Sequence, residues 1–202
     1  MSTFKVDYES FPGAVSTIRS QASELNSELT SAFKAIEETH SVWTGNRYNE
    51  LAKKFSDIVT DVNDILSLVV TTIPYTLEQI ANNYEAADNE TDAVAAKREE
   101  PTKVSVTVPG KEILYIDSSA VDPYKSTVKT ALENAKGNMN SIESTVSGLT
   151  WEGQSSETYK GRLTKLKTSL SSAFDDINSS FDVLASAAQA EFEKAEAANN
   201  IL

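Results

Sequence analysis

The chain has 202 residues, of which 40% are hydrophobic and 24% are charged, a composition typical of one or two folded domains. It contains no cysteine and a single histidine, His40, which excludes disulfide bonds and thiolate metal sites and leaves little for histidine-based catalysis. Its formal net charge of −12 opposes binding to the phosphate backbone of nucleic acids, so no nucleic-acid partner is expected.

The N-terminal sequence contains no basic segment followed by an apolar stretch, so no cleaved secretory signal peptide is predicted. No run approaches the roughly eighteen apolar residues of a membrane-spanning helix, and none is expected. Taken alone, these two expectations indicate a cytosolic protein.

Helical periodicity begins near the N-terminus. Apolar residues recur every three or four positions over 15–36, which predicts an amphipathic helix. The pattern stops before Trp43-Thr44-Gly45 and resumes over 48–87, which predicts a second helix. Pro74 interrupts this second run and is expected to kink the helix, because proline removes one backbone hydrogen bond. The first part of the chain, 1–98, is therefore predicted to be a helical hairpin.

The following segment, 99–120, has a different character. Residues 103–108 and 112–116 are β-prone and flank the turn-forming dipeptide Pro109-Gly110, which predicts a short β-hairpin. The alternative is a semi-ordered linker between two helical regions. No other strand signal occurs in the chain.

The helical pattern then returns. Apolar residues recur over 121–149, the pattern stops at Trp151-Glu152-Gly153, and it continues over 159–195, so a second hairpin is predicted over 121–202. Helices of this length are too long to bury an apolar stripe alone; residues 46–88 would extend about 64 Å. Two such hairpins in one chain predict an all-α fold, an elongated antiparallel four-helix bundle that closes within the monomer.

Two glycines fall inside the predicted helices of the second hairpin. Gly137 and Gly161 each cost roughly 1 kcal/mol relative to alanine in a helix interior. A close crossing of two helices is the expected reason for these glycines, and chance is the alternative.

Two short sequence motifs each occur twice in the chain, with the same spacing between their copies. The first is a Trp-x-Gly tripeptide at each of the only two tryptophans, which lie 108 residues apart. The second is an aromatic residue 41 positions after each tryptophan, with an acidic residue four positions further on. A repeat of this kind indicates a tandem duplication. The eight residues are Trp43, Gly45, Tyr84 and Asp88 in the first copy and Trp151, Gly153, Phe192 and Glu196 in the second.

A Trp-x-Gly turn between two amphipathic helices, followed by Tyr-x-x-x-Asp or Glu near the end of the second helix, resembles the WXG (early-secreted-antigen-like) family of proteins exported by type VII secretion systems. The resemblance covers nearly the whole chain, as two fused copies. It implies hairpins that pair into a four-helix arrangement, and it implies that Tyr84 and Asp88 form an export signal. The second copy departs from the family pattern because Phe192 lacks the tyrosine hydroxyl, although Glu196 keeps the acid.

The resemblance also implies a function and a set of partners. The protein would be a secreted, non-enzymatic substrate of a type VII system, exported folded and without a cleaved signal peptide; no cofactor or metal is expected. The implied partners are the membrane ATPase of the translocon and either a helical effector or another WXG-family protein. The alternatives are an export adaptor or chaperone for a larger helical effector or toxin, and a lytic helical protein.

Antiparallel pairing of the hairpins would bring the turn of one copy near the helix end of the other. Tyr84 and Asp88 lie one helical turn apart on the same face and can meet a partner together. The tryptophans are expected to anchor a partner, to plug the ends of the bundle, or to do both together. In this way one monomer would imitate a WXG dimer. Because the family that the chain resembles assembles a bipartite signal in this way across a dimer, the resemblance implies two composite sites: Trp151 and Gly153 with Tyr84 and Asp88, and Trp43 and Gly45 with Phe192 and Glu196.

Overall fold

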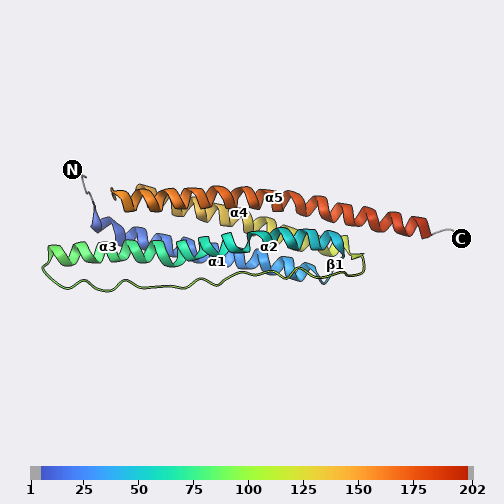
Figure 1. Ribbon diagram of the computed structural model, residues 1–202, viewed down its shortest axis with the longest axis horizontal. Helices are drawn as coiled ribbons and strands as arrows, with labels where there is room; N and C mark the ends of the chain where they lie inside the picture. Colours follow the sequence, from blue (N-terminus) through green and yellow to red (C-terminus); the bar gives the residue numbers. More distant parts are fainter. Residues whose placement is uncertain (1–5, 200–202) are drawn as a thin grey trace. The chain divides into compact units, whose positions relative to one another are not determined.

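The computed structural model describes residues 6–199, which Figure 1 colours along the chain. Most of them are helical, and the strands among them are two residues long, so the predicted all-α fold class is confirmed. The elements in chain order are a 3-10 helix Tyr8–Ser10, α1 Phe11–Thr39, β1 Trp43–Thr44, α2 Asn46–Leu66, a π-helical segment Ser67–Thr72, α3 Ile73–Asp88, β2 Tyr115–Ile116, α4 Ser118–Gly148 and α5 Gln154–Asn199.

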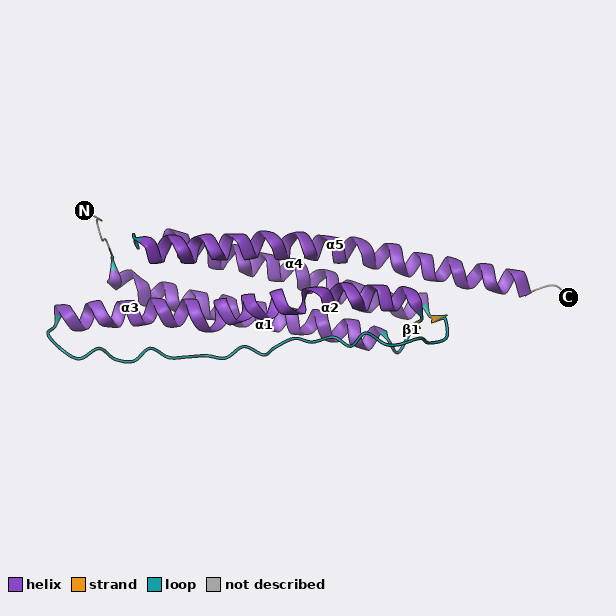
Figure 2. Ribbon diagram, viewed as in Figure 1, coloured by secondary structure: helices purple, strands orange, loops and turns teal. Residues whose placement is uncertain are grey.

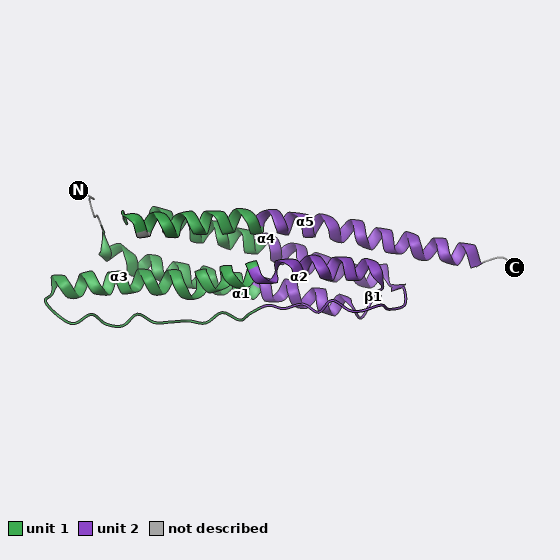
Figure 3. Cartoon of the chain, in the orientation of Figure 1, with its two compact units in different colours: residues 1–27, 61–103, 134–170 green, residues 28–60, 104–133, 171–202 purple. Residues whose placement is uncertain are grey.

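The contacts divide the chain into two compact units, which Figure 3 colours separately. Each long helix contributes one part to unit 1 and another to unit 2, so each unit is a bundle of four helical segments drawn from both predicted copies. The unit boundaries therefore do not follow the predicted hairpins. Unit 1 comprises 1–27, 61–103 and 134–170, and unit 2 comprises 28–60, 104–133 and 171–202.

The predicted apolar stripes supply the core of each unit. A few of their residues, such as Ile58 and Leu166, are only partly buried, and toward the ends of the stripes Tyr84, Ala87 and Ala195 are exposed. In unit 2 the end of α5 runs on past the other segments, so its last turns have no neighbour to pack against (Figure 3). Fully buried large side chains include Phe11, Ile18, Leu25 and Ile65 in unit 1, and Leu29, Ile36, Trp43, Tyr48, Leu51, Phe55, Phe174 and Phe181 in unit 2.

Pro74 perturbs its helix without ending it. The helix is continuous from Asn46 to Asp88, and the π-helical segment Ser67–Thr72 comes directly before the proline, which lies in the first turn of α3. Proline has no backbone N–H to donate and its ring crowds the preceding turn. The wider π-helical hydrogen-bond pattern accommodates both effects, so the perturbation expected at Pro74 takes the form of a π-helical insertion.

The same helix bears on the expectation that no segment of the chain spans a membrane. Among the described residues, Asn46–Asp88 is the one helix whose length and composition would allow it to cross a membrane. However, 44% of its most apolar window is buried inside the protein, and the core helix of a bundle has the same composition. Its apolar residues are used in packing.

The segment between α3 and α4 follows an extended path without a hairpin of its own (Figure 2). Its only strand, β2, pairs antiparallel with β1, so that Ile116 lies opposite Trp43. The predicted hairpin across 103–116 is therefore replaced by pairing with the first turn. The physical reason is that helix side chains satisfy the linker backbone: Asn26 both donates to and accepts from Thr102, at 2.7 and 2.8 Å.

Gly137 and Gly161 do not mark a close crossing of helices. A Cβ atom built at either position meets no other atom within 4 Å, and both residues are exposed. The expectation of a close crossing is wrong at both positions.

Candidate functional site

The two Trp-x-Gly turns have the same local geometry. Gly45 and Gly153 have positive φ angles, +104° and +125°, which strain any residue with a Cβ atom. The carbonyl oxygen of each glycine accepts the first hydrogen bond of the following helix, from the N–H of Asn49 and of Glu157, both at 3.1 Å. The repetition of glycine therefore has a structural reason. In each turn the glycine adopts the positive φ and accepts the first hydrogen bond of the helix that follows, which is α2 after Gly45 and α5 after Gly153.

Each tryptophan also pairs with an extended dipeptide that comes shortly before a helix. The two dipeptides are Val6-Asp7, which pairs with Trp151, and Ile116-Asp117, which pairs with Trp43. In both, the aspartate N–H donates to the carbonyl oxygen of the residue before the tryptophan, at 3.0 Å in unit 1 and 2.9 Å in unit 2. The arrangement is reciprocal, since the dipeptide of each copy meets the turn of the other.

Trp151 is a packing residue of unit 1. Its side chain is 5% exposed and contacts Phe11 edge-on, with ring centroids 6.4 Å apart. Tyr159 lies on another side, at 5.8 Å. A partner would therefore meet the surroundings of this turn rather than the indole ring.

Trp43 is buried completely in unit 2. It stacks on Phe181 of α5, with ring centroids 6.1 Å apart, and contacts Tyr48 edge-on at 5.9 Å. Its indole N–H has no acceptor among the described residues. Burial raises the pKa of Tyr48 to about 12, and its hydroxyl donates to the Ile36 carbonyl oxygen at 3.0 Å. Both tryptophans are thus core residues, Trp151 in unit 1 and Trp43 in unit 2.

Tyr84 and Asp88 lie at the surface of unit 1, at the end of α3. Tyr84 is 40% exposed, and its ring stacks on Tyr8, with centroids 6.2 Å apart and planes 9° from parallel. The Tyr8 hydroxyl donates to a carboxylate oxygen of Asp88 at 2.7 Å, and this hydrogen bond raises the pKa of Tyr8. The aromatic and acidic groups of the motif are therefore held side by side by a third residue.

Unit 1 thus contains all the members of the first predicted composite site. Trp151 and Tyr84 are connected through the N-terminal segment 6–11, because Val6 and Phe11 contact the tryptophan and Tyr8 contacts the tyrosine. The N-terminal segment was not expected to take part. A repeated signal in the sequence points to it, namely a β-branched residue followed by aspartate shortly before the first helix of each copy.

In the second predicted composite site, the aromatic residue of the motif is not the one that contacts the tryptophan. The ring that stacks on Trp43 belongs to Phe181, and Phe192 follows eleven residues later, about 16 Å further along α5. Phe192 is half-buried and Glu196 is exposed. The end of α5 is tied to the Trp43 turn by an ion pair instead, in which Arg47 donates to Glu191 at 2.7 Å.

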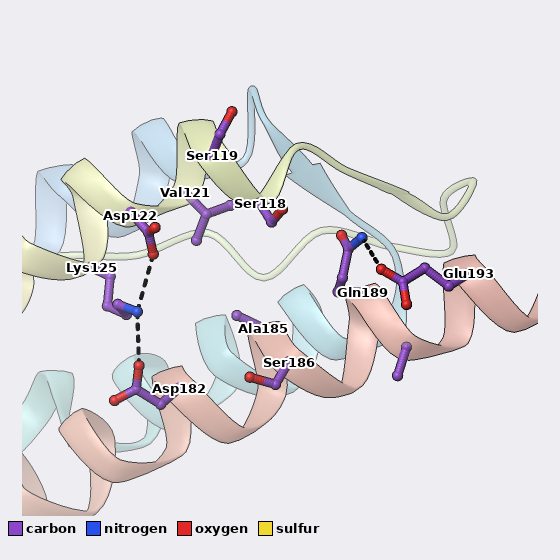
Figure 4. Close-up of a pocket in the computed structure, with 11 residues that line it drawn as sticks. Ser118, Ser119, Val121, Asp122, Lys125, Asp182, Ala185, Ser186, Gln189 and Glu193 are labelled. Carbon is purple, nitrogen blue, oxygen red and sulfur yellow. Dashed lines mark hydrogen bonds and ion pairs between the residues drawn. The ribbon is translucent and has the colours of Figure 1, made fainter.

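A groove in unit 2 lies between the start of α4 and the second half of α5 (Figure 4). Lys125 lies at one end of it and contacts Asp182 at 2.9 Å and Asp122 at 3.1 Å. Hydrogen bonds to these two carboxylates raise the pKa of Lys125. The lysine offsets one of the two negative charges, and its ion pair with Asp182 connects α4 to α5. Among the described residues, no group of histidine, aspartate and glutamate side chains is placed to hold a metal ion.

No protein-family model, curated protein or solved structure matches this chain. The resemblance to the WXG family therefore rests on the repeated motifs alone. The reciprocal dipeptide contacts are a further sign of a duplication, because Val6-Asp7 and Ile116-Asp117 are not part of the Trp-x-Gly motif.

Proposed function

We propose that this protein is a non-enzymatic substrate of a type VII secretion system, exported folded through a bipartite signal. One part is the Trp-x-Gly turn at Trp151 and Gly153, and the other is the Tyr-x-x-x-Asp pair of Tyr84 and Asp88. The observation that carries the proposal is the second pair: an aromatic ring and a carboxylate stand exposed on one face at a helix end, in the same unit as the turn.

The chemistry of the pair suits recognition by another protein. A half-exposed tyrosine ring offers apolar area and a hydroxyl, and a carboxylate one helical turn away offers a charged acceptor. Trp151 is buried, so its contribution would be to fix the turn and the segment that contacts Tyr84. The proposed receptor is the membrane ATPase of the translocon.

The signal is proposed to be asymmetric. Phe192 has no hydroxyl, and Glu196 lies on an exposed helix end that no other segment of unit 2 covers. A monomer with one working signal would then imitate a WXG dimer whose two members differ.

The test is export in the native host, measured as the ratio of protein in the supernatant to protein in the cells. Tyr84→Ala and Asp88→Ala should abolish export. Phe192→Ala and Glu196→Ala are the matched controls in the second copy and should leave export near the wild-type ratio. Circular dichroism of each purified variant checks that the helices remain. Wild-type export of Tyr84→Ala would refute the proposed signal.

A second candidate function is that of an export adaptor for a larger helical effector. The observation that favours it is the end of α5, where residues from Glu191 to Asn199 are exposed except for the half-buried Phe192. A helical effector would find an uncovered helix there. Under this hypothesis, truncation after Ala190 should stop export of the effector while this protein is still exported. If both continue to be exported, the adaptor function is excluded at this surface.

A further inference from the structure

We infer that Tyr8 is a positioning residue of the proposed export signal, which fixes the ring of Tyr84 and the carboxylate of Asp88 in one arrangement for the receptor. The inference rests on the proposed function and adds a residue that the Tyr-x-x-x-Asp motif does not contain. The recognition surface then consists of side chains from two segments, the end of α3 and the residues before α1.

The need for a positioning residue follows from where the motif lies. Asp88 is the last residue of α3, and Glu90, two residues later, already has a positive φ of 53°. Exposed side chains in a final helical turn are free to populate several rotamers, and a receptor that orders them loses binding free energy. The parallel stack and the hydrogen bond from Tyr8 restrict both side chains before the receptor arrives.

Tyr8 is itself held firmly. It begins a 3-10 helix, and Val6 and Asp7 just before it pair with the backbone of the Trp151 turn. Phe11, three residues later, is fully buried against Trp151. The segment is thus fixed on both sides of Tyr8. This explains how a buried tryptophan can affect an exposed signal, because Trp151 anchors the segment that positions Tyr84.

The second copy supplies an internal comparison. Ile116-Asp117 makes the same contacts with its tryptophan turn as Val6-Asp7 does, but the residue that follows is Ser118. A serine side chain cannot stack on an aromatic ring. An aromatic residue thus follows the dipeptide in the first copy, as Tyr8, and not in the second. The first copy is also the one whose second helix ends with Tyr-x-x-x-Asp.

Three variants test the role of Tyr8 in the export assay. Tyr8→Ser installs the residue of the second copy and should lower the supernatant-to-cell ratio about tenfold, because both the stack and the hydrogen bond are lost. Tyr8→Phe keeps the stack and should recover part of that loss. Tyr115→Phe removes the hydroxyl of an exposed tyrosine in unit 2 and should export like the wild type.

A destabilised variant of unit 2 separates positioning from a general effect on folding. Phe55→Ala removes a fully buried ring and leaves Tyr8, Tyr84 and Asp88 unchanged, so it should be exported better than Tyr8→Ser at a temperature where circular dichroism shows both variants folded. An export defect of Phe55→Ala as strong as that of Tyr8→Ser would mean that Tyr8 acts through overall stability and would overturn the inference.

The same experiment distinguishes failure of the inference from failure of the proposed function. If Tyr84→Ala is exported normally, the proposed signal is refuted and Tyr8 has nothing to position. If Tyr84→Ala is blocked and Tyr8→Ser is exported normally, the signal stands and the inference is refuted alone. Increased export of Tyr8→Ser would mean that Tyr8 covers the signal, which also refutes it.

Discussion

Replacing Gly137 or Gly161 with alanine is expected to stabilise the protein. Both glycines lie inside long helices, and a Cβ atom at either position meets nothing within 4 Å. The substitution therefore introduces neither a clash nor a new contact. What remains is the intrinsic difference between glycine and alanine in a helix, about 0.8–1.0 kcal/mol in favour of alanine at each site.

The matched controls are the two glycines of the turns. Gly45 and Gly153 have positive φ angles, where an L residue costs roughly 1–2 kcal/mol, so alanine should destabilise the protein at both. At Gly45 the new Cβ would lie 3.4 Å from the Leu114 Cα atom, an ordinary van der Waals contact, so the expected loss comes from the backbone conformation. The same glycine-to-alanine substitution should therefore raise the free energy of unfolding inside a helix and lower it in a turn.

Urea unfolding followed by circular dichroism measures both effects. With an m value of about 2 kcal/mol/M, a gain of about 1 kcal/mol raises the unfolding midpoint by about 0.5 M. The reasoning is refuted if Gly137→Ala and Gly161→Ala both lower the midpoint. It is also refuted if Gly153→Ala leaves the midpoint unchanged.

Three further predictions concern the core, the assembly and the pH dependence. Phe55 and Phe174 are 0% and 1% exposed, so Phe55→Ala and Phe174→Ala should each cost about 3–5 kcal/mol in urea unfolding, and losses below about 1 kcal/mol would contradict their burial. Light scattering should give the monomer mass of 22.0 kDa, whereas twice that mass would mean that hairpins pair between chains. Because burial raises the pKa of Tyr48 to about 12 from its usual 10, the neutral side chain stabilises the fold below pH 10 and that stability is lost as pH rises through 12. Tyr48→Phe should lessen this loss, and an identical pH profile for the variant would refute the assignment.

The helices could be predicted from the sequence because their cause is local. An apolar residue every third or fourth position over 15–36 is enough to make one buried face, and α1 spans Phe11–Thr39. The Trp-x-Gly turns are local as well, since a positive φ at Gly45 or Gly153 strongly favours glycine. In these places neighbouring residues in the sequence determine the structure.

The linker could not be predicted in the same way. Residues 103–108 alternate like a strand, but the partners that satisfy the linker backbone are side chains far away in the sequence. Asn26 is 76 residues from Thr102, and Asn49 donates to the carbonyl oxygen of Gly110 from 61 residues away, at 2.9 Å. A pattern within one segment cannot reveal such partners, so the predicted hairpin was wrong in its pairing.

The contribution of Tyr8 to the candidate site was missed for the same reason. Its hydroxyl contacts Asp88 across 80 residues of sequence, and the contact depends on two intermediate pairings at the Trp151 turn. The useful signal was the repeated dipeptide, Val6-Asp7 and Ile116-Asp117, which lies outside the motif of the family that the chain resembles.

The unequal surroundings of the two tryptophans lead to a prediction about export. Trp151 anchors the segment that carries Tyr8, whereas Trp43 stacks on Phe181 in unit 2. Trp151→Ala should therefore reproduce the export defect of Tyr84→Ala, and Trp43→Ala should do so less. Both substitutions remove a buried aromatic side chain and should cost about 3–5 kcal/mol, so export must be compared at a temperature where circular dichroism shows both variants folded. If both variants are folded and Trp43→Ala has the stronger export defect, the connection between the Trp151 turn and Tyr84 is refuted. The export defects of both variants would then be explained by their loss of stability alone.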